Sequence, residues 1–320
     1  MTSKKWLLAL GAGLVLALGA AACGDDDDDG GEASASGVSG TIRIDGSSTV
    51  APLTSIAAEE FQGENPDVNV TVGTSGTSGG FEKFCAGETD ANDASRQIEP
   101  EEQKACSENG VEYGEVQVAN DALSVIVNPN NPLTCIGVET LNQAWDKGST
   151  VDSWGDLDGL DADVGDEDLE LFGPGSDSGT YDYFTEAVNG EEGVIRTDYN
   201  SIGENDNAAI NGVAGDEWAM AYVPYSFVEE AGEQVKALEI DGGDGCVAPT
   251  AETVQDGSYT PLGRPLFVYP SAEALAKPEF DAFLEFYIAN QASLTEAATF
   301  VPMTEEQTQA SEEEISKLIG

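Results

Sequence analysis

The chain has 320 residues, of which 40% are hydrophobic, and its 61 acidic and 12 basic residues give a net charge of −49 with no histidine. This length and apolar share allow one large or two medium domains, and the charge repels nucleic acid and anionic lipid as partners. Without histidine, neither a Ser-His-Asp triad nor a histidine metal site can form.

The N-terminus has the pattern of an export signal. Two lysines precede an unbroken run of apolar and small residues at 6–22, which predicts a signal peptide over 1–22. The segment AAACG that ends this run resembles the lipobox of bacterial lipoproteins, in which the cysteine, here Cys23, is lipidated. Ala20 stands where that pattern usually has leucine, and a plain signal peptide with a spare cysteine is the alternative.

Residues 23–40 are predicted to be an acidic, extended tether, because a run of five aspartates at 25–29 and the small polar residues after it cannot build a core. The protein would then be extracytoplasmic and held on the outer face of the cytoplasmic membrane by lipidated Cys23. We expect no other membrane contact.

From residue 41 onward, apolar strands alternate with helical patterns. Helices are predicted from about residue 50 to 63, at about 79–85, and twice after Ser271. Strands are predicted at 41–45, 68–72, 122–128, 169–172, 218–223 and 265–269. This alternation predicts an α/β protein with mostly parallel sheets, and the length favours two domains.

Three loops share one design, in which a strand leads through glycine, serine and threonine into a helix. They lie at 46–49, 73–80 and 175–180. The start of a helix leaves backbone N–H groups unpaired and carries partial positive charge, so such loops attract anions. Serine and threonine also cap ordinary helices, but three such loops with surplus hydroxyls favour an anion site.

A cationic partner for the anion is expected from Arg96, one of four arginines, which follows Ser95 at an apparent strand end. Its planar fork could hold two oxygens of a tetrahedral anion, although a surface salt bridge is the alternative. Enzyme motifs are absent, since neither G-x-S-x-G nor G-x-x-x-x-G-K-[ST] occurs. The aspartate-rich stretch 151–170 fails the EF-hand template and is interpreted as part of an acidic, halophile-like surface, so no metal or cofactor is expected.

Four cysteines follow Cys23, an even number suited to disulfides in an oxidising compartment. Three pairings are open, and we favour Cys85–Cys106 with Cys135–Cys246. A zinc site is the alternative, but the chain has no paired C-x-x-C spacing.

Several motifs together resemble the phosphate-binding lipoproteins that serve ABC-type phosphate importers. They are IDGSSTVAPL, VGTSGTSGGFEKFCAGETDANDASRQI, VANDALSVIVNPNNP, LFGPGSDSGTYDYFTEAVNG and GRPLFVY, in order over about 41–300. The resemblance implies a type II periplasmic-binding-protein fold, with two α/β lobes joined by a hinge of crossing strands. Lobe one would take 41–120 and 264–320, and lobe two 121–263.

The same resemblance implies a set of phosphate ligands. The residues at matching positions are Thr49, the N–H of Val50, Thr77, Ser78, Ser95, Arg96, Ser178, Gly179 and Thr180. Pro174 stands where some members carry an arginine, so the arginine must come from elsewhere. Family members accept the proton of phosphate with an aspartate, and the candidates by position are Asp93 and Asp177.

The expected function is therefore binding of inorganic phosphate between the lobes and delivery to the permease of an ABC importer, by a monomer without enzymatic activity. The alternatives are another oxyanion, such as sulfate, molybdate or arsenate, on the same scaffold, or a phosphate-sensing surface lipoprotein that does not transport.

Overall fold

A mixed sheet of nine strands organises the part of the chain that the computed structural model describes, which is residues 37–176, 178–203 and 205–319. Its order is β2-β1-β3-β12-β4-β8-β6-β7, and β9 pairs with β4 outside this path. The predicted signal peptide, Cys23, most of the tether and Asp177 lie outside the described residues.

One end of the sheet is parallel. Strand β1 (Gly40–Gly46) lies between β2 (Val68–Val72) and β3 (Ala91–Ala94) and runs parallel to both. The carboxyl ends of these strands therefore meet at one edge, where helices α1 (Ala51–Glu64) and α2 (Thr77–Cys85) begin. This edge brings the first two predicted anion loops together.

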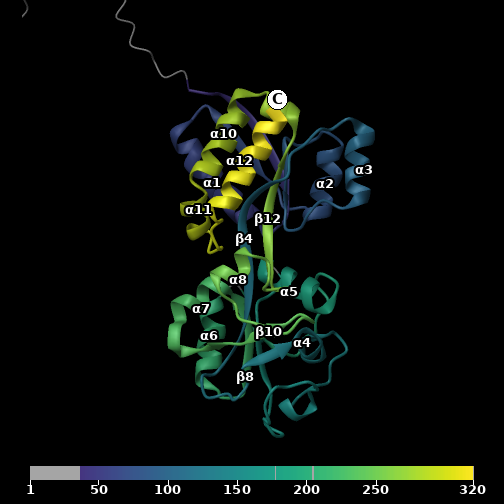
Figure 1. The fold of residues 1–320 in the computed structure, drawn as a ribbon, viewed down its shortest axis with the longest axis vertical. Coiled ribbons are helices and arrows are strands. Elements are labelled where there is room, and N and C mark those ends of the chain that lie inside the picture. The colour runs from purple at the N-terminus through teal and green to yellow at the C-terminus, as the bar shows by residue number, and fades with distance from the viewer. Residues whose placement is uncertain (1–36, 177, 204, 320) are drawn as a thin grey trace, which may run out of the picture. The chain divides into compact units, whose positions relative to one another are not determined.

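The centre of the sheet is antiparallel. Strand β4 (Val116–Val127) pairs with β12 (Gly263–Pro270), and Figure 1 shows both running between the part with α1, α10 and α12 and the part with α5, α6 and α7. Strand β12 also pairs antiparallel with β3, and β4 with β8 and β9. The expectation of mostly parallel sheets is therefore wrong for the central strands, because the returning strand β12 runs opposite to the outgoing β4.

The remaining strands lie beyond this crossing. Parallel pairing joins β8 (Ala219–Pro224) to β6 (Glu170–Gly173) and β6 to β7 (Asn200–Ser201), while β9 covers Lys236–Ala237. A second sheet of three strands consists of β5 (Cys135–Gly137), β10 (Glu239–Asp241) and β11 (Cys246–Val247).

Most helices join or flank these strands. They are α3 (Pro100–Asn109), α4 (Val138–Trp145), α5 (Gly179–Asn189), α6 (Asp206–Gly215), α7 (Tyr225–Ala231), α8 (Ala251–Gln255), α9 (Ala272–Leu275), α10 (Pro278–Ala289), α11 (Gln291–Ala297) and α12 (Glu305–Ile319). Short 3-10 helices cover Trp154–Asp156 and Gly232–Gln234. After Ser271 the described chain forms four helices where we expected two, because Pro278 starts α10 and Asn290 ends it.

The apolar core consists of four clusters that draw on different parts of the sequence. Two clusters draw on residues 38–119 and 266–318, and two others on residues 122–262 with Val301 as the one addition from further along. Aromatic rings anchor each side, for example Phe61 against Phe283 and Phe184 stacked on Tyr222. The cores separate near the predicted lobe boundaries, but Gly37–Gly320 form one compact unit of contacts, so the division into two lobes stays a prediction.

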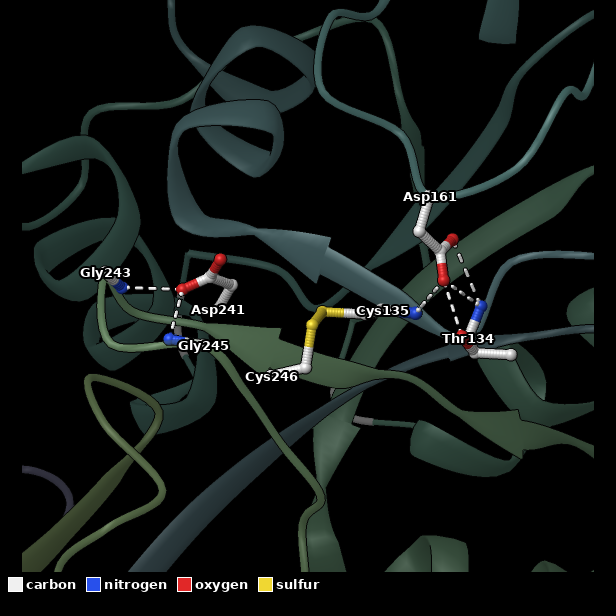
Figure 2. Close-up of a disulfide and its surroundings, with 7 residues drawn as sticks. All are labelled: Thr134, Cys135, Asp161, Asp241, Gly243, Gly245 and Cys246. Atoms are coloured by element: carbon white, nitrogen blue, oxygen red, sulfur yellow. Dashed lines mark hydrogen bonds between the residues drawn. A yellow bond between two sulfur atoms is a disulfide. The ribbon is translucent and has the colours of Figure 1, made fainter.

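Both favoured disulfides are confirmed. Cys85–Cys106 joins α2 to α3, and Cys135–Cys246 joins β5 to β11 across 111 residues of sequence. Figure 2 shows Asp161 accepting hydrogen bonds from Thr134 and from the N–H of Cys135 beside the second disulfide. Because all four cysteines are paired, the zinc alternative is wrong.

Within the described ranges, no group of potential ligands is arranged to hold a metal ion. The same part of the chain contains no helix that is both long and apolar enough to span a membrane.

Candidate functional site

Asp45 ties the first two glycine-rich loops together at the end of β1. Its Oδ1 accepts hydrogen bonds from the N–H of Gly46 and from both the N–H and the hydroxyl of Ser75, and its Oδ2 pairs with Lys83. Partial burial raises the pKa of Asp45, but the bonds from Lys83, Ser75 and Gly46 outweigh it and lower the pKa to about 2. This carboxylate is therefore ionised at neutral pH and fixes the second loop against the first.

Two glycines allow the loops to approach closely. The side chain of Asn92 on β3 lies between them, since a Cβ on Gly80 would stand only 1.9 Å from Asn92 Oδ1. A Cβ on Gly46 would fall 2.7 Å from the same oxygen, and the N–H of Gly76 donates to the carbonyl of Gly46 over 2.9 Å. Larger residues at Gly46 or Gly80 would force the loops apart.

Threonine hydroxyls mark the inner face of these loops. Thr49 Oγ1 accepts a hydrogen bond from Arg264 Nη2 over 3.0 Å. Thr77 Oγ1 lies 3.1 Å from Ser95 Oγ and accepts the Ser95 N–H over 3.2 Å. The residues expected from the first loop, the second loop and the end of β3 thus face one region.

The third loop, which follows strand β6, contacts the first loop, which follows strand β1. Ser178 caps α5, and its hydroxyl accepts the N–H of Thr180 over 3.3 Å. A Cβ on Gly179 would stand 3.3 Å from Thr49 Cα, so the backbones of the two loops are in contact. Asp182 adds a second link, because its Oδ2 accepts a hydrogen bond from Ser48 Oγ over 3.1 Å. All three predicted loops therefore converge around Thr49.

Arg264, the second residue of strand β12, supplies the cation where the loops meet. Its Nε lies 3.5 Å from Asp121 Oδ2 and its Nη1 3.5 Å from Glu186 Oε2. The guanidinium stacks on the ring of Tyr183 at 3.4 Å from the centroid. Its buried Nε–H makes no hydrogen bond with any described residue, so the guanidinium retains donor capacity.

A cavity of about 20 Å³ lies where the loops meet. Because one water needs about 10–15 Å³, this space is about the size of one or two water molecules. Its lining comprises Ser47, Ser48, Thr49, Gly76, Thr77, Ser95, Asp182, Tyr183, Glu186, Glu192 and Arg264. A second cavity of about 290 Å³ shares Ser48 and Thr49 with it and contains Ser178, Gly179 and Thr180. Six of the nine predicted ligands thus line two cavities that share Thr49.

Three of the predicted ligands lie further out. Val50 is fully buried behind Thr49 and does not line the small cavity. Arg96 donates to both carboxylate oxygens of Glu102 at 2.9 and 2.8 Å and to Ser78 Oγ at 2.8 Å. Hydrogen bonding to Glu102 raises the pKa of Arg96, while burial opposes the rise. Arg96 lines an outer cavity of about 380 Å³ that Arg264 also lines.

Arg264 and Asp182 are site residues that the sequence analysis missed. The sequence feature that could have indicated Arg264 is its position in GRPLFVY, a motif at the start of a predicted strand.

Asp93, one of the two proposed proton acceptors, does not line either cavity at the loops. Its side chain is fully buried, and its carboxyl oxygens make no hydrogen bond with described residues. Burial raises its pKa to about 8, the Thr54 hydroxyl opposes the rise and the charge of Asp45 adds to it. Asp177, the other candidate, lies outside the described residues.

Asp182, in the first turn of α5, is one of three carboxylates that line the small cavity. Burial raises the pKa of Asp182 and the nearby charge of Glu186 adds to this, whereas Ser48 and Arg264 stabilise the ionised form. The site thus combines donors from hydroxyls, backbone and one guanidinium with carboxylate acceptors. Such a set can hold a partly protonated anion reversibly.

Comparison with known proteins identifies the family of the chain. A family model described as a PBP superfamily domain matches residues 31–291. Protein SphX of Synechocystis is 38% identical over 270 residues, which cover 83% of this chain and 79% of that protein. The phosphate-binding protein PstS of Staphylococcus saprophyticus is 33% identical over 324 residues, covering 99% of this chain and 96% of that protein.

A crystal structure of a possible phosphate binding protein from Planctomyces limnophilus superposes with a TM-score of 0.84 at 38% identity. The superposition covers 88% of this chain and 100% of the Planctomyces chain. The α/β fold and the resemblance described above are thereby confirmed, and the relatives are binding proteins rather than enzymes. The chain therefore belongs to the PBP superfamily and, within it, to the family of PstS phosphate-binding proteins.

Proposed function

We propose that this protein binds inorganic phosphate in the cavity around Thr49 and delivers it to an ABC importer. The observation that carries the proposal is the convergence of the first two loops, helix α5 and one guanidinium on a cavity of about 20 Å³, with the third loop at the adjoining cavity. Hydroxyls of Thr49, Thr77 and Ser95 supply short hydrogen bonds to the phosphate oxygens. The relatives named phosphate-binding proteins support this ligand.

Arg264 is the arginine that contacts the anion in this proposal. It lines the small cavity, whereas Arg96 is held outside it by Glu102. Arg96 remains a candidate for a contact at the outer cavity. A lysine in place of the contacting arginine keeps the charge but loses the planar fork, so Arg264→Lys is expected to weaken phosphate binding by about 10- to 100-fold.

Asp182 accepts the proton of bound phosphate in this proposal. Its carboxylate lines the cavity, and Ser48 already orients it. A carboxylate acceptor favours phosphate over sulfate, because sulfate at neutral pH has no proton to donate and would leave two anionic oxygens in repulsion. Asp182→Asn should therefore reduce the preference for phosphate, whereas Asp93→Asn should leave it unchanged.

The deciding experiment is titration calorimetry of the full-length protein with phosphate, sulfate, arsenate and molybdate in turn. Wild-type protein, Arg264→Lys and Arg96→Lys are compared, with Arg43→Lys as the control, since Arg43 is exposed on β1 away from the loops. Tight phosphate binding that Arg264→Lys weakens and Arg43→Lys preserves is the expected result. Stronger binding of sulfate or molybdate than of phosphate would reassign the ligand.

The cellular setting of this function is an export pathway. We infer two lobes that close over the anion about β4 and β12, and an extracytoplasmic protein anchored through lipidated Cys23. Cys23→Ser should then release the protein from the membrane fraction. Deleting the gene should lower phosphate uptake by cells at low external phosphate; unchanged uptake would instead favour a protein that senses phosphate without transporting it.

A further inference from the structure

The larger of the two cavities that share Thr49 has two kinds of lining. Hydroxyls of Thr49, Ser178 and Thr180 form one part of it, and the rings of Phe227 and Phe300 belong to the other. Its volume of about 290 Å³ is close to that of the smallest pockets that hold drug-sized molecules, about 300 Å³. Since one water takes about 30 Å³ of liquid volume, a phosphate ion at the hydroxyls would leave much of this cavity to solvent.

The hydroxyls of this cavity have donor capacity for an anion. Thr180 Oγ1 makes no hydrogen bond with any described residue, and Ser178 Oγ accepts the N–H of Thr180 but keeps its own proton. Thr49 Oγ1 accepts a bond from Arg264 and likewise keeps its proton. Thr49 and Ser178 are each only 8% exposed, so unpaired donors there favour a bound ligand.

The two rings come from different parts of the core. Phe227, on α7, packs against the cluster that contains Ile210, whereas Phe300, after α11, packs against the cluster that contains Leu53. Both rings are half-buried, and within the described part of the chain neither contacts another aromatic ring. An apolar group in the cavity would therefore remove surface of both rings from water, which is favourable.

Two carboxylates restrict the charge of such a group. Asp121 on β4 and Asp206 at the start of α6 also line the cavity. They would repel a second negative charge on the ligand at short range. The lining thus selects a substituent that is apolar and carries no negative charge.

Resting on the proposed function, we propose that the protein also binds organic phosphorus compounds in this larger cavity. The PO₃ group of the ligand lies at Thr49, which both cavities share, and accepts hydrogen bonds from the hydroxyls of Ser178 and Thr180. The single apolar substituent on phosphorus lies against Phe227 and Phe300. Phosphonates, with a P–C bond, and phosphate monoesters, with a P–O–C link, share this chemistry. Diphosphates, nucleotides and ligands with a carboxylate are excluded by their added negative charge.

Calorimetry of the full-length protein with inorganic phosphate and a set of organic ligands tests this proposal. Phenylphosphonate is expected to bind about tenfold more tightly than methylphosphonate, because its ring is buried against the two phenylalanines. Propylphosphonate should bind about tenfold more tightly than phosphonopropionate, which has nearly the same length but an added carboxylate. Phenyl phosphate distinguishes the two sources of the ligand. If its affinity matches that of phenylphosphonate, the cavity takes monoesters as well, and if it binds about tenfold more weakly or less, the cavity takes phosphonates.

Two variants test the apolar lining directly. Phe227→Ala removes one ring, and Ala298→Phe fills the cavity, which Ala298 lines. The matched control is Phe286→Ala, because Phe286 is also half-buried but lies on α10, where it packs against Phe61 outside the cavity. We expect Phe227→Ala to weaken phenylphosphonate binding by about tenfold and Ala298→Phe to abolish it. Both should bind inorganic phosphate within about twofold of the wild type, which also shows that they are folded, and the control should match the wild type with both ligands.

Phosphate binding without any binding of phenylphosphonate or phenyl phosphate would overturn this inference and leave the proposed function standing. Equal affinities for phenylphosphonate and methylphosphonate would have the same consequence. So would cavity variants that leave phenylphosphonate binding unchanged, or that weaken the binding of phosphate and phenylphosphonate equally. Absence of phosphate binding by the wild type would overturn the proposed function as well.

Discussion

Asp93 is a carboxyl group whose ionisation is strongly disfavoured in the folded protein. Its side chain is fully buried on β3, and the nearby Thr54 hydroxyl is hydrogen-bonded to Tyr287 over 3.1 Å. Burial raises its pKa to about 8, so the carboxyl is mostly protonated at neutral pH. We therefore predict that Asp93→Asn, which is neutral at every pH, removes a pH dependence from the stability of the protein.

The sign and size of this effect follow from proton linkage. The ordinary pKa of the group is 3.8, so between about pH 4 and pH 8 the folded protein holds a proton that the unfolded chain has released. The free energy of unfolding then falls as pH rises, by about 1.4 kcal/mol per pH unit, or about 2.7 kcal/mol from pH 5 to pH 7. The decrease in the free energy of unfolding begins near the pKa of Asp93 in the unfolded chain. It ends near the pKa in the folded protein, where the total decrease is at most about 6 kcal/mol.

Other carboxylates do not hide this dependence. Asp45, with a pKa lowered to about 2, contributes stability that is complete above about pH 5 and lost as pH falls toward 2. Asp121 has a pKa raised by burial, which Arg264 opposes, and so changes stability in the same direction as Asp93. Only the difference between the wild type and Asp93→Asn isolates the single group. The buried amide of the variant adds an offset that does not vary with pH.

Urea unfolding at several pH values between about 5 and 8 measures this difference. The stability of Asp93→Asn relative to wild type should rise by about 2.7 kcal/mol from pH 5 to pH 7. Asp67→Asn is the control, because Asp67 is exposed between α1 and β2. If the wild type and Asp93→Asn keep a constant difference across this range, the carboxyl is already ionised in the folded protein and the reasoning fails.

Three further predictions concern the disulfide, loop contact and charge. Replacing Cys135 and Cys246 by serine opens a link across 111 residues and should lower the free energy of unfolding by about 4 kcal/mol, as urea denaturation would reveal. Gly179→Ala places a Cβ 3.3 Å from Thr49 Cα, so calorimetry should give about tenfold weaker phosphate binding, and unchanged affinity would show that the contact yields freely. Raising KCl from about 0.1 to about 1 M should speed phosphate association in stopped-flow experiments, since salt screens the net charge of −49; slower association would point to attraction by a local cation.

Six of the twelve described strands were predictable from apolar or β-branched runs, whereas the shorter strands β3, β5, β7, β9, β10 and β11 were not predicted. β-Branched runs such as VNVTV at 68–72 became β2 without change, and 265–269 lies inside β12. The direction of pairing was not predictable in this way. Nothing local to β12 shows that it returns antiparallel beside β4, since its partner residues, such as Asp121 opposite Arg264, are far away in sequence.

The same distinction between local sequence patterns and long-range contacts applies to the candidate site. The three loops were predictable, because glycine and hydroxyl residues before a helix have a local physical meaning. Arg264 was not, because its contact with Thr49 joins residues 215 positions apart. Asp182 meets Ser48 across 134 positions for the same reason, whereas the short-range pattern around Arg96 drew attention to a side chain that the structure pairs with Glu102.

These contacts explain how an anion site can operate in a molecule with a net charge of −49. The guanidinium of Arg264 is already balanced by Asp121 and Glu186, so little net positive charge is left to attract the ligand. What distinguishes the proposed site is geometry, because Asp45 and the close approach of Gly179 to Thr49 already bring hydroxyls and helix starts together. Hydrogen bonds of this kind act over about 3 Å and survive salt, whereas the repulsion of the acidic surface is long-range and screened. An acidic coat and an anion site are therefore compatible because they act over different distances.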